Sequence, residues 1–153
     1  MSIVKGKHVR IGKNTQLNNV IIKDNVSIGA NCIIFGSSKR KVIIGENSYI
    51  SPNCYMNGYF GLKIGKDVTI SERVSIFSDS GPNKGLLQKV FKIVKKKIII
   101  NDGCWIGAHC ILLPGSEMEK NSVLATNSVL KTKVAELELY AGSPAKFKYK
   151  INV

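Results

Sequence analysis

An aliphatic residue returns at every sixth position through the stretch from Asn101 to Leu130. These anchors are Ile106, Leu112, Met118, Leu124 and Leu130. A period of six fits neither the 3.6 residues of a helical turn nor the two-residue alternation of an ordinary strand. A unit this short cannot bury its own apolar side chain, so the units must stack on one another. The periodicity therefore predicts a parallel β-helix, in which each unit is a short strand followed by a turn.

The same rhythm extends toward the N-terminus and groups into triplets. The earlier anchors are Ile22, Ile28 and Ile34, then Ile44, Ile50 and Met56, then Ile64, Ile70 and Ile76, and then Ile100 ahead of Ile106 and Leu112. Three units make one triangular coil. The fourth position of the first two units in a triplet is usually Asn, Asp, Gly or His, as at Asn25, Asn47 and His109. These residue types tolerate the left-handed backbone that a tight corner requires.

We interpret the 153 residues as one repeat domain, 1–153, since the repeat leaves no room for a second core. Residues 1–21 are expected to form a ragged capping coil, because the rhythm slips there, and residues 131–153 a C-terminal extension. Extra residues always follow the third anchor of a triplet, and the longest insertion is 82–99. All insertions should therefore leave from one corner, where binding and catalysis are expected. The spacing within 82–99 fits both a short helix and a strand.

The net charge of the chain indicates which class of partner it binds. Lys and Arg number 23 against 10 Asp and Glu, a formal net charge of +13, which favours anionic ligands or surfaces. Few aromatic residues accompany the lysines, so we predict no nucleic-acid binding, whereas the amphipathic stretch 84–97 suits contact with a membrane surface. No apolar run approaches the roughly 18 residues of a membrane span, and the first ten residues lack a signal-peptide core. A cytoplasmic location is predicted.

The spacing of the four cysteines favours a structural role for them. They show no CxxC spacing and the chain has only two histidines, so we expect no metal site. Cys32 and Cys54 occupy the same column of small residues in successive coils. We expect them to be stacked, buried and reduced, as in most cytosolic proteins.

Three motifs carry a resemblance to a known family. Trp105 and Gly107 flank an anchor, Pro114-Gly115 follows, and the tail reads Ala-Gly-Ser-Pro-Ala-Lys over 141–146. In this order they resemble the hexapeptide-repeat acyltransferases, in the branch of the galactoside and maltose O-acetyltransferases. The resemblance implies an all-β, left-handed parallel β-helix of hexapeptide repeats with one long loop and a short C-terminal extension. It further implies a homotrimer with acetyl-CoA, and no metal, in grooves between subunits.

Carried over by position, the family's cofactor contacts fall on Trp105, Ala108, Thr126, Lys131, Thr132 and Lys146. The backbone at Ala108 and Thr126 would meet the pantetheine arm, and the lysines would lie near the phosphates. A phosphorylated cofactor needs ammonium groups and free backbone amides. The other reading is that these lysines are simply solvated.

The sequence departs from the family at the catalytic centre. The family has a histidine before a proline at the start of the long loop, and here Gly81 precedes Pro82. Asp79 and Ser80 stand beside that position, and Asp79 would serve as a base if its pKa were raised. A family asparagine aligns near Ser51, so Ser51 and Gly81 would line the acceptor pocket. On this reading, a histidine at position 81 should restore a base.

Two functions remain open. The first is an acetyl-CoA-dependent O-acetyltransferase acting on a sugar or polysaccharide precursor. The alternative is a catalytically degenerate hexapeptide-repeat protein that binds CoA, a sugar or a partner without turnover. Retained cofactor residues with a lost base fit both, and a transfer assay beside a CoA-binding titration separates them.

Overall fold

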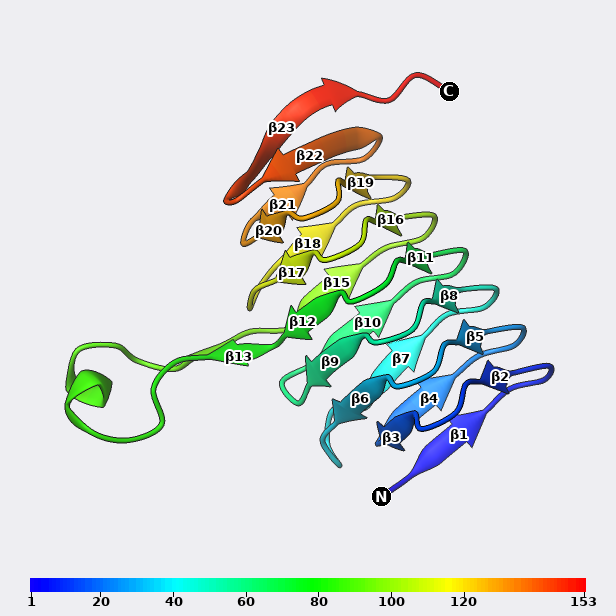
Figure 1. Ribbon diagram of the computed structural model, residues 1–153, viewed down its shortest axis with the longest axis horizontal. Coiled ribbons are helices and arrows are strands. Elements are labelled where there is room, and N and C mark those ends of the chain that lie inside the picture. Colours follow the sequence, from blue (N-terminus) through cyan, green and yellow to red (C-terminus); the bar gives the residue numbers. More distant parts are fainter.

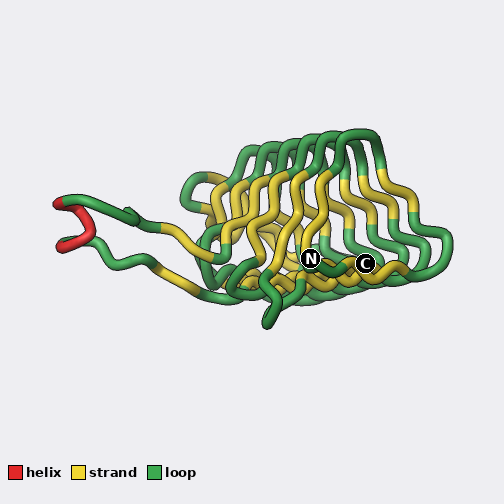
Figure 2. The backbone as a smooth tube through the Cα atoms, turned by 90° about the horizontal axis from the view of Figure 1, so that it is seen from below, coloured by secondary structure: helices red, strands yellow, loops and turns green.

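The computed structural model covers residues 1–153 and is a stack of coils with strands on three sides (Figures 1 and 2). Each coil adds one strand to each of three sheets, named A, B and C in chain order. Sheet A contains β1 (Ile3–Lys5), β4 (Val20–Ile22), β7 (Val42–Ile44), β10 (Leu62–Ile64), β15 (Ile98–Ile100), β18 (Glu117–Met118) and β21 (Lys133–Val134). Sheet B contains β2 (Arg10–Ile11), β5 (Ser27–Ile28), β8 (Tyr49–Ile50), β11 (Thr69–Ile70), β16 (Trp105–Ile106), β19 (Val123–Leu124), β22 (Glu138–Gly142) and β23 (Ala145–Lys150). Sheet C contains β3 (Gln16–Asn18), β6 (Ile33–Gly36), β9 (Tyr55–Gly58), β12 (Ser75–Phe77), β17 (Ile111–Leu112) and β20 (Val129–Leu130).

The predicted anchors form the core. All of them are buried, and they stack in parallel register, as where Ile70 pairs with Ile50 below and Ile106 above. Burying an aliphatic side chain of this size contributes roughly 1.5–3 kcal/mol, so the column of anchors accounts for much of the stability. The six-residue period therefore predicted both the strands and the buried residues correctly.

Two of the three corners adopt the predicted left-handed conformation. The A–B corner, where the chain turns from sheet A to sheet B, has positive φ angles at His8, Asn25, Asn47, Asp67, Gly103, Asn121 and Leu137. The B–C corner has them at Asn14, Asn31, Asn53, Arg73, His109 and Asn127. Side-chain amides continue the ladder, since Asn25 Nδ2 donates to Asn47 Oδ1 at 3.2 Å and Asn47 Nδ2 donates to Asp67 Oδ1 at 3.0 Å. Both histidines are thus corner residues.

The two ends are more regular than the sequence suggested. Residues 1–21 form a complete coil, in which β1, β2 and β3 pair in parallel with β4, β5 and β6. This coil is more regular than predicted, because only the spacing from Leu17 to Ile22 is shortened. The β-helix also continues past Leu130, because Val134 pairs with Met118 and Tyr140 pairs with Leu124. The antiparallel strand β23 then covers the open edge of β22.

All insertions leave from the C–A corner, as predicted. The longest forms an arm that projects away from the coils (Figures 1 and 2). Its stem is the antiparallel pair β13 (Asp79–Ser80) and β14 (Val94–Lys95), and near its tip lies the 3₁₀ helix η1 (Leu86–Lys89). The insertion therefore contains both a short helix and a strand. No helix of this structure has the length and apolar character that a bilayer-spanning helix needs.

Candidate functional site

The foot of the arm presents a fixed carboxylate. Asp79 is half-buried on β13, and Asn57 Nδ2 donates a hydrogen bond to Asp79 Oδ1 at 2.5 Å. Asn57 belongs to the coil below, on β9 of sheet C. This bond uses one carboxylate oxygen and anchors the side chain to the rigid stack. The role of Asn57 was missed from sequence, because the contact spans 22 residues and appears only when the coils are stacked.

Gly81 lies where the resemblance expects a histidine, and its backbone explains the glycine. Its φ is +149°, and a Cβ atom there would lie 2.8 Å from Ile93 Cα on the returning side of the arm. A side chain at position 81 would require the returning segment to move, so our expectation that a histidine here restores a base needs correction. Ser80 next to it is exposed and pairs with Val94 across the stem.

Within one chain, Ser51 and Gly81 do not lie close together. Ser51 is buried and follows β8 at the B–C corner, and its carbonyl oxygen accepts a hydrogen bond from Cys32 Sγ at 3.3 Å. Gly81 is exposed and follows β13 at the C–A corner. The two residues lie at opposite edges of sheet C. A pocket lined by both would require two subunits.

The upper coils gather several cofactor candidates at the B–C corner. Asn127 N, in the coil above, donates a hydrogen bond to Ala108 O at 2.9 Å. Thr126 precedes Asn127 in the chain and therefore lies close to Ala108. The antiparallel strand β23 places Lys146 opposite Ala141, directly above this corner in the stack. Trp105 is exposed on the outer face of sheet B, where its Nε1 donates to Ser71 Oγ at 3.3 Å.

The remaining two candidates lie elsewhere. Lys131 and Thr132 follow β20 and occupy the C–A corner, where Thr132 O accepts a hydrogen bond from Glu117 N at 3.2 Å. Within one chain, Lys131 and Thr132 therefore lie across sheet C from the candidates at the B–C corner, and Trp105 lies on sheet B.

The cysteines lie inside the coils as free, buried thiols. Cys32 Sγ and Cys54 Sγ each donate to a corner carbonyl, those of Ser51 and Ser71, at 3.3 and 3.2 Å. Burial raises the pKa of the Cys104 thiol and that of the Cys110 thiol. These groups pack and satisfy corner carbonyls, and none of them faces the arm or Trp105.

Sequence comparisons agree with the repeat. Residues 97–131 match the family described as the hexapeptide repeat of succinyl-transferase. A galactoside O-acetyltransferase of Lactococcus lactis is 30% identical over 132 residues, which is 82% of this chain and 63% of that protein. The galactoside O-acetyltransferase of Escherichia coli is 26% identical over 119 residues, 78% of this chain and 59% of that protein. The chain thus spans about three fifths of the length of these relatives.

Solved structures resemble the whole stack. A variant of AntD, an N-acyltransferase from Bacillus cereus in complex with dTDP-4-amino-4,6-dideoxyglucose and coenzyme A, superposes with a TM-score of 0.86 at 24% identity, covering 98% of this chain and 84% of that one. A hexapeptide-repeat acetyltransferase from Vibrio cholerae, complexed with acetyl-CoA, gives a TM-score of 0.71 at 20% identity and covers 97% of this chain and 70% of that chain. At such identities the likeness concerns the fold, which is the left-handed parallel β-helix that the motifs implied. The sequence matches, for their part, support a hexapeptide-repeat acyltransferase similar to the galactoside and maltose O-acetyltransferases.

Proposed function

We propose that this protein transfers an acetyl group from acetyl-CoA to a sugar. The observation that carries the proposal is the B–C corner, where Ala108 and Thr126 lie on adjacent coils and Lys146 lies on the strand that covers the last coil. The relatives that share this repeat include two galactoside O-acetyltransferases. A polysaccharide precursor as acceptor, and a cytoplasmic location, remain predictions from the sequence.

The candidate residues suit a phosphorylated, elongated co-substrate. Lys131 and Lys146 are exposed, and neither forms an ion pair within the chain. Their ammonium groups can therefore pair with phosphates, while backbone groups at Ala108 and Thr126 serve an amide-bearing arm. Bound acetyl-CoA would supply the thioester, which is the activated acyl group of the reaction.

A trimer would assemble the complete groove. The outer face of sheet C carries an aromatic ladder of Phe35, Tyr55 and Phe77, whose neighbouring ring centroids lie 5.9 and 5.7 Å apart. Half-buried Ile111 and Leu113 extend this surface. Three copies that pack sheet C around a common axis would bury it and set the B–C corner of one subunit against the C–A corner of the next. Cofactor candidates and the arm would then meet in one groove.

Asp79 is the best-placed base in that groove. The acceptor oxygen forms a bond to the thioester carbonyl carbon while its proton passes to a carboxylate oxygen of Asp79. The C–S bond breaks, and the CoA thiolate leaves and takes up that proton. Asn57 holds Oδ1 of that carboxylate, which leaves Oδ2 for the acceptor. A carboxylate is a weaker base than imidazole, so positioning of the acceptor and electrostatic stabilisation in the groove must supply much of the rate.

A second acceptor class, an amino sugar, is favoured by Gly81. An amine with a pKa near 8 is partly neutral at pH 7 and is a nucleophile without a strong base, whereas a hydroxyl needs one. A chain that has no room for the family histidine at position 81 is better suited to the easier acceptor. AntD, an N-acyltransferase of similar fold, is seen in complex with an amino sugar linked to dTDP and with coenzyme A.

Other partners remain predictions. The apolar side chains of the arm, Leu86, Leu87, Val90 and Phe91, are all exposed. They suit contact either with a neighbouring subunit or with a membrane surface through residues 84–97. A degenerate protein without turnover is not favoured, because the named relatives are transferases.

The test is acetyl transfer from acetyl-CoA to a panel of neutral sugars and amino sugars, followed by release of the CoA thiol. We expect Asp79→Asn to lower the rate with a hydroxyl acceptor by about 10²–10⁴-fold, the usual contribution of a general base, and to lower it less with an amine. Asp67→Asn is the matched control, because asparagine fits that corner position. Equal activity of all three proteins would contradict the role of Asp79, and CoA binding without transfer to any acceptor would revive the degenerate alternative.

A further inference from the structure

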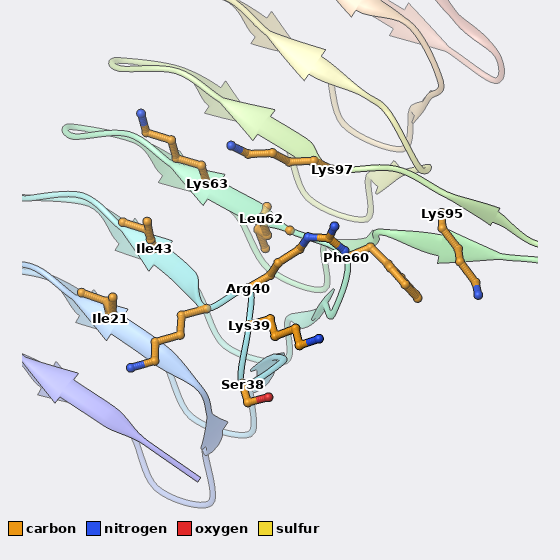
Figure 3. A pocket seen from close by; sticks show the side chains of 12 residues that line it. Ile21, Ser38, Lys39, Arg40, Ile43, Phe60, Leu62, Lys63, Lys95 and Lys97 are labelled. Atoms are coloured by element: carbon orange, nitrogen blue, oxygen red, sulfur yellow. The ribbon is translucent and has the colours of Figure 1, made fainter.

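A large basic concavity lies at the C–A corner on the outer face of sheet A. Its volume is about 910 Å³, and its floor contains Ile21 of β4, Ile43 of β7 and Leu62 of β10 (Figure 3). Its cations are Lys39, Arg40, Lys41, Lys63, Lys95 and Lys97. They come from three coils and from the returning strand of the arm. The concavity is therefore a product of stacking and not of a local sequence motif.

The walls are held in place before any ligand arrives. The turn that carries Arg40 is closed by two hydrogen bonds, from Ser37 N to Arg40 O at 2.9 Å and from Arg40 N to Ser37 Oγ at 3.0 Å. Figure 3 shows the Arg40 side chain pointing toward Leu62 and Phe60. The opposite wall is fixed because Phe60 N donates to the buried Ser78 Oγ at 3.0 Å. Such preorganisation lowers the entropic cost of binding.

The charges of the concavity have no partner within the chain. No carboxylate lines it, and the ion pairs of the structure involve only Lys133, with Glu117 and Glu119. Six like charges around one hollow repel one another, and an anion would relieve that repulsion. The planar guanidinium of Arg40 can bind a phosphate through two hydrogen bonds, and the lysines act as point charges beside it.

The size and the floor of the concavity define the ligand further. A single phosphate fills little of 910 Å³, and six cations exceed what one phosphate needs. The apolar floor and the Phe60 ring, over which Lys95 Nζ lies 5.1 Å from the centroid, require a ligand with an uncharged or planar part as well. A diphosphate attached to a larger organic group satisfies both conditions.

The concavity adjoins the proposed reaction centre. Lys95 lines it and is also the partner of Asp79 in the stem of the arm. The cofactor candidates Ala108, Thr126 and Lys146 lie at the other border of sheet C. Resting on the proposed function, we infer that the concavity binds the diphosphate of the acceptor, which is a diphosphate-linked sugar. The sugar would extend from the diphosphate toward Asp79.

The test uses calorimetric titration of the full chain with UDP, which represents a nucleotide-linked acceptor, and with geranyl diphosphate, which represents an isoprenoid-linked one. We expect at least one of them to bind more tightly than UMP. Arg40→Ala with Lys63→Ala should weaken that binding by about tenfold or more, as expected for two lost charge-assisted contacts. The matched control, Lys7→Ala with Lys120→Ala, removes the same charge from exposed sites at the A–B corner and should change the affinity less than twofold.

Several outcomes would overturn the inference. Equal weakening in both double variants would mean that only net charge matters. Competition between CoA and the diphosphate would assign the concavity to the cofactor. Failure of both diphosphates to bind, while CoA binds and a neutral sugar is acetylated, would remove the inference and leave the proposed function intact. Diphosphate binding at the concavity without any acetyl transfer would instead remove the acceptor role and the proposed function with it.

Discussion

The A–B and B–C corners have the same length in every complete coil, whereas the C–A corner has a different length in each. Six residues separate the anchors across the first two corners, as from Ile100 to Ile106 and from Ile106 to Leu112. Across the C–A corner the spacing ranges from four residues, Leu130 to Val134, to 24, Ile76 to Ile100. The constant corners build the frame, and the variable corner carries the arm, Asp79 and the basic concavity.

The difference has a physical cause. A left-handed residue at each constant corner turns the chain from one sheet to the next. Its backbone bonds to the corner of the adjacent coil, and at Asn25, Asn47 and Asp67 the side chains do so as well. An inserted residue would break that ladder and shift every later anchor off its column. At the C–A corner the backbone leaves the stack, so added residues extend into solvent at little cost in packing.

The largest expected effect is the difference in thermal stability between a substitution inside the frame and one on the arm. Ile106→Asp buries an unpaired carboxylate at a fully buried position and should cost several kcal/mol, enough to unfold the protein or lower its Tm sharply. Phe91→Asp, on the exposed arm, should leave Tm nearly unchanged. Thermal unfolding followed by circular dichroism compares them. Similar Tm values for the two variants would mean that the interior has been assigned to the wrong residues.

A second substitution tests the constant corner directly. Asn47→Val places a β-branched side chain at φ 59° and removes two ladder hydrogen bonds, so it should cost about 2–3 kcal/mol. Asn47→Gly keeps the left-handed backbone and should cost less. Ser38→Val, in the C–A loop, should have almost no effect. Urea denaturation measures all three, and a Ser38→Val loss as large as that of Asn47→Val would erase the distinction between the corners.

The thiols that bond to the constant corners should make stability depend on pH. Burial raises the pKa of Cys104 and that of Cys110 above the ordinary thiol value of 9.0, so the folded protein holds these protons more tightly than the unfolded chain does. Their contribution is fully present below about pH 9, the unfolded value, and is lost as pH rises above it. Urea midpoints at pH 7.5 and pH 10 should therefore differ less in Cys104→Ala with Cys110→Ala than in wild type. An identical pH dependence in both proteins would contradict this.

The smallest effect is expected at the arm. Gly81→His must displace the segment around Ile93, so trypsin should cleave the arm faster while Tm changes little, because the arm lies outside the frame. Acetyl transfer should not increase. A large gain in transfer by Gly81→His would show that the arm adjusts freely and that position 81 still faces an acceptor.

The period of six was sufficient to predict the frame. It identified the buried column through Ile70 and Ile106 and the left-handed corners at residues such as Asn47 and His109, because each repeats the same local geometry at a fixed spacing. The regularity of the two ends was not predicted, since one shortened C–A corner at each end hides the register. The family motifs gave the candidate cofactor residues, which no local pattern places in space.

The sequence by itself determined the β-helix, its core and the corner from which every insertion leaves, because stacking requires each short unit to satisfy the same packing conditions. Only the tertiary structure decided that Asn57 holds Asp79, that Ile93 leaves no room for a side chain at Gly81, and that Arg40, Lys63 and Lys95 share one concavity. These relationships join residues from different coils and from the two sides of the arm. Their spacing varies with each insertion, so no sequence period encodes them.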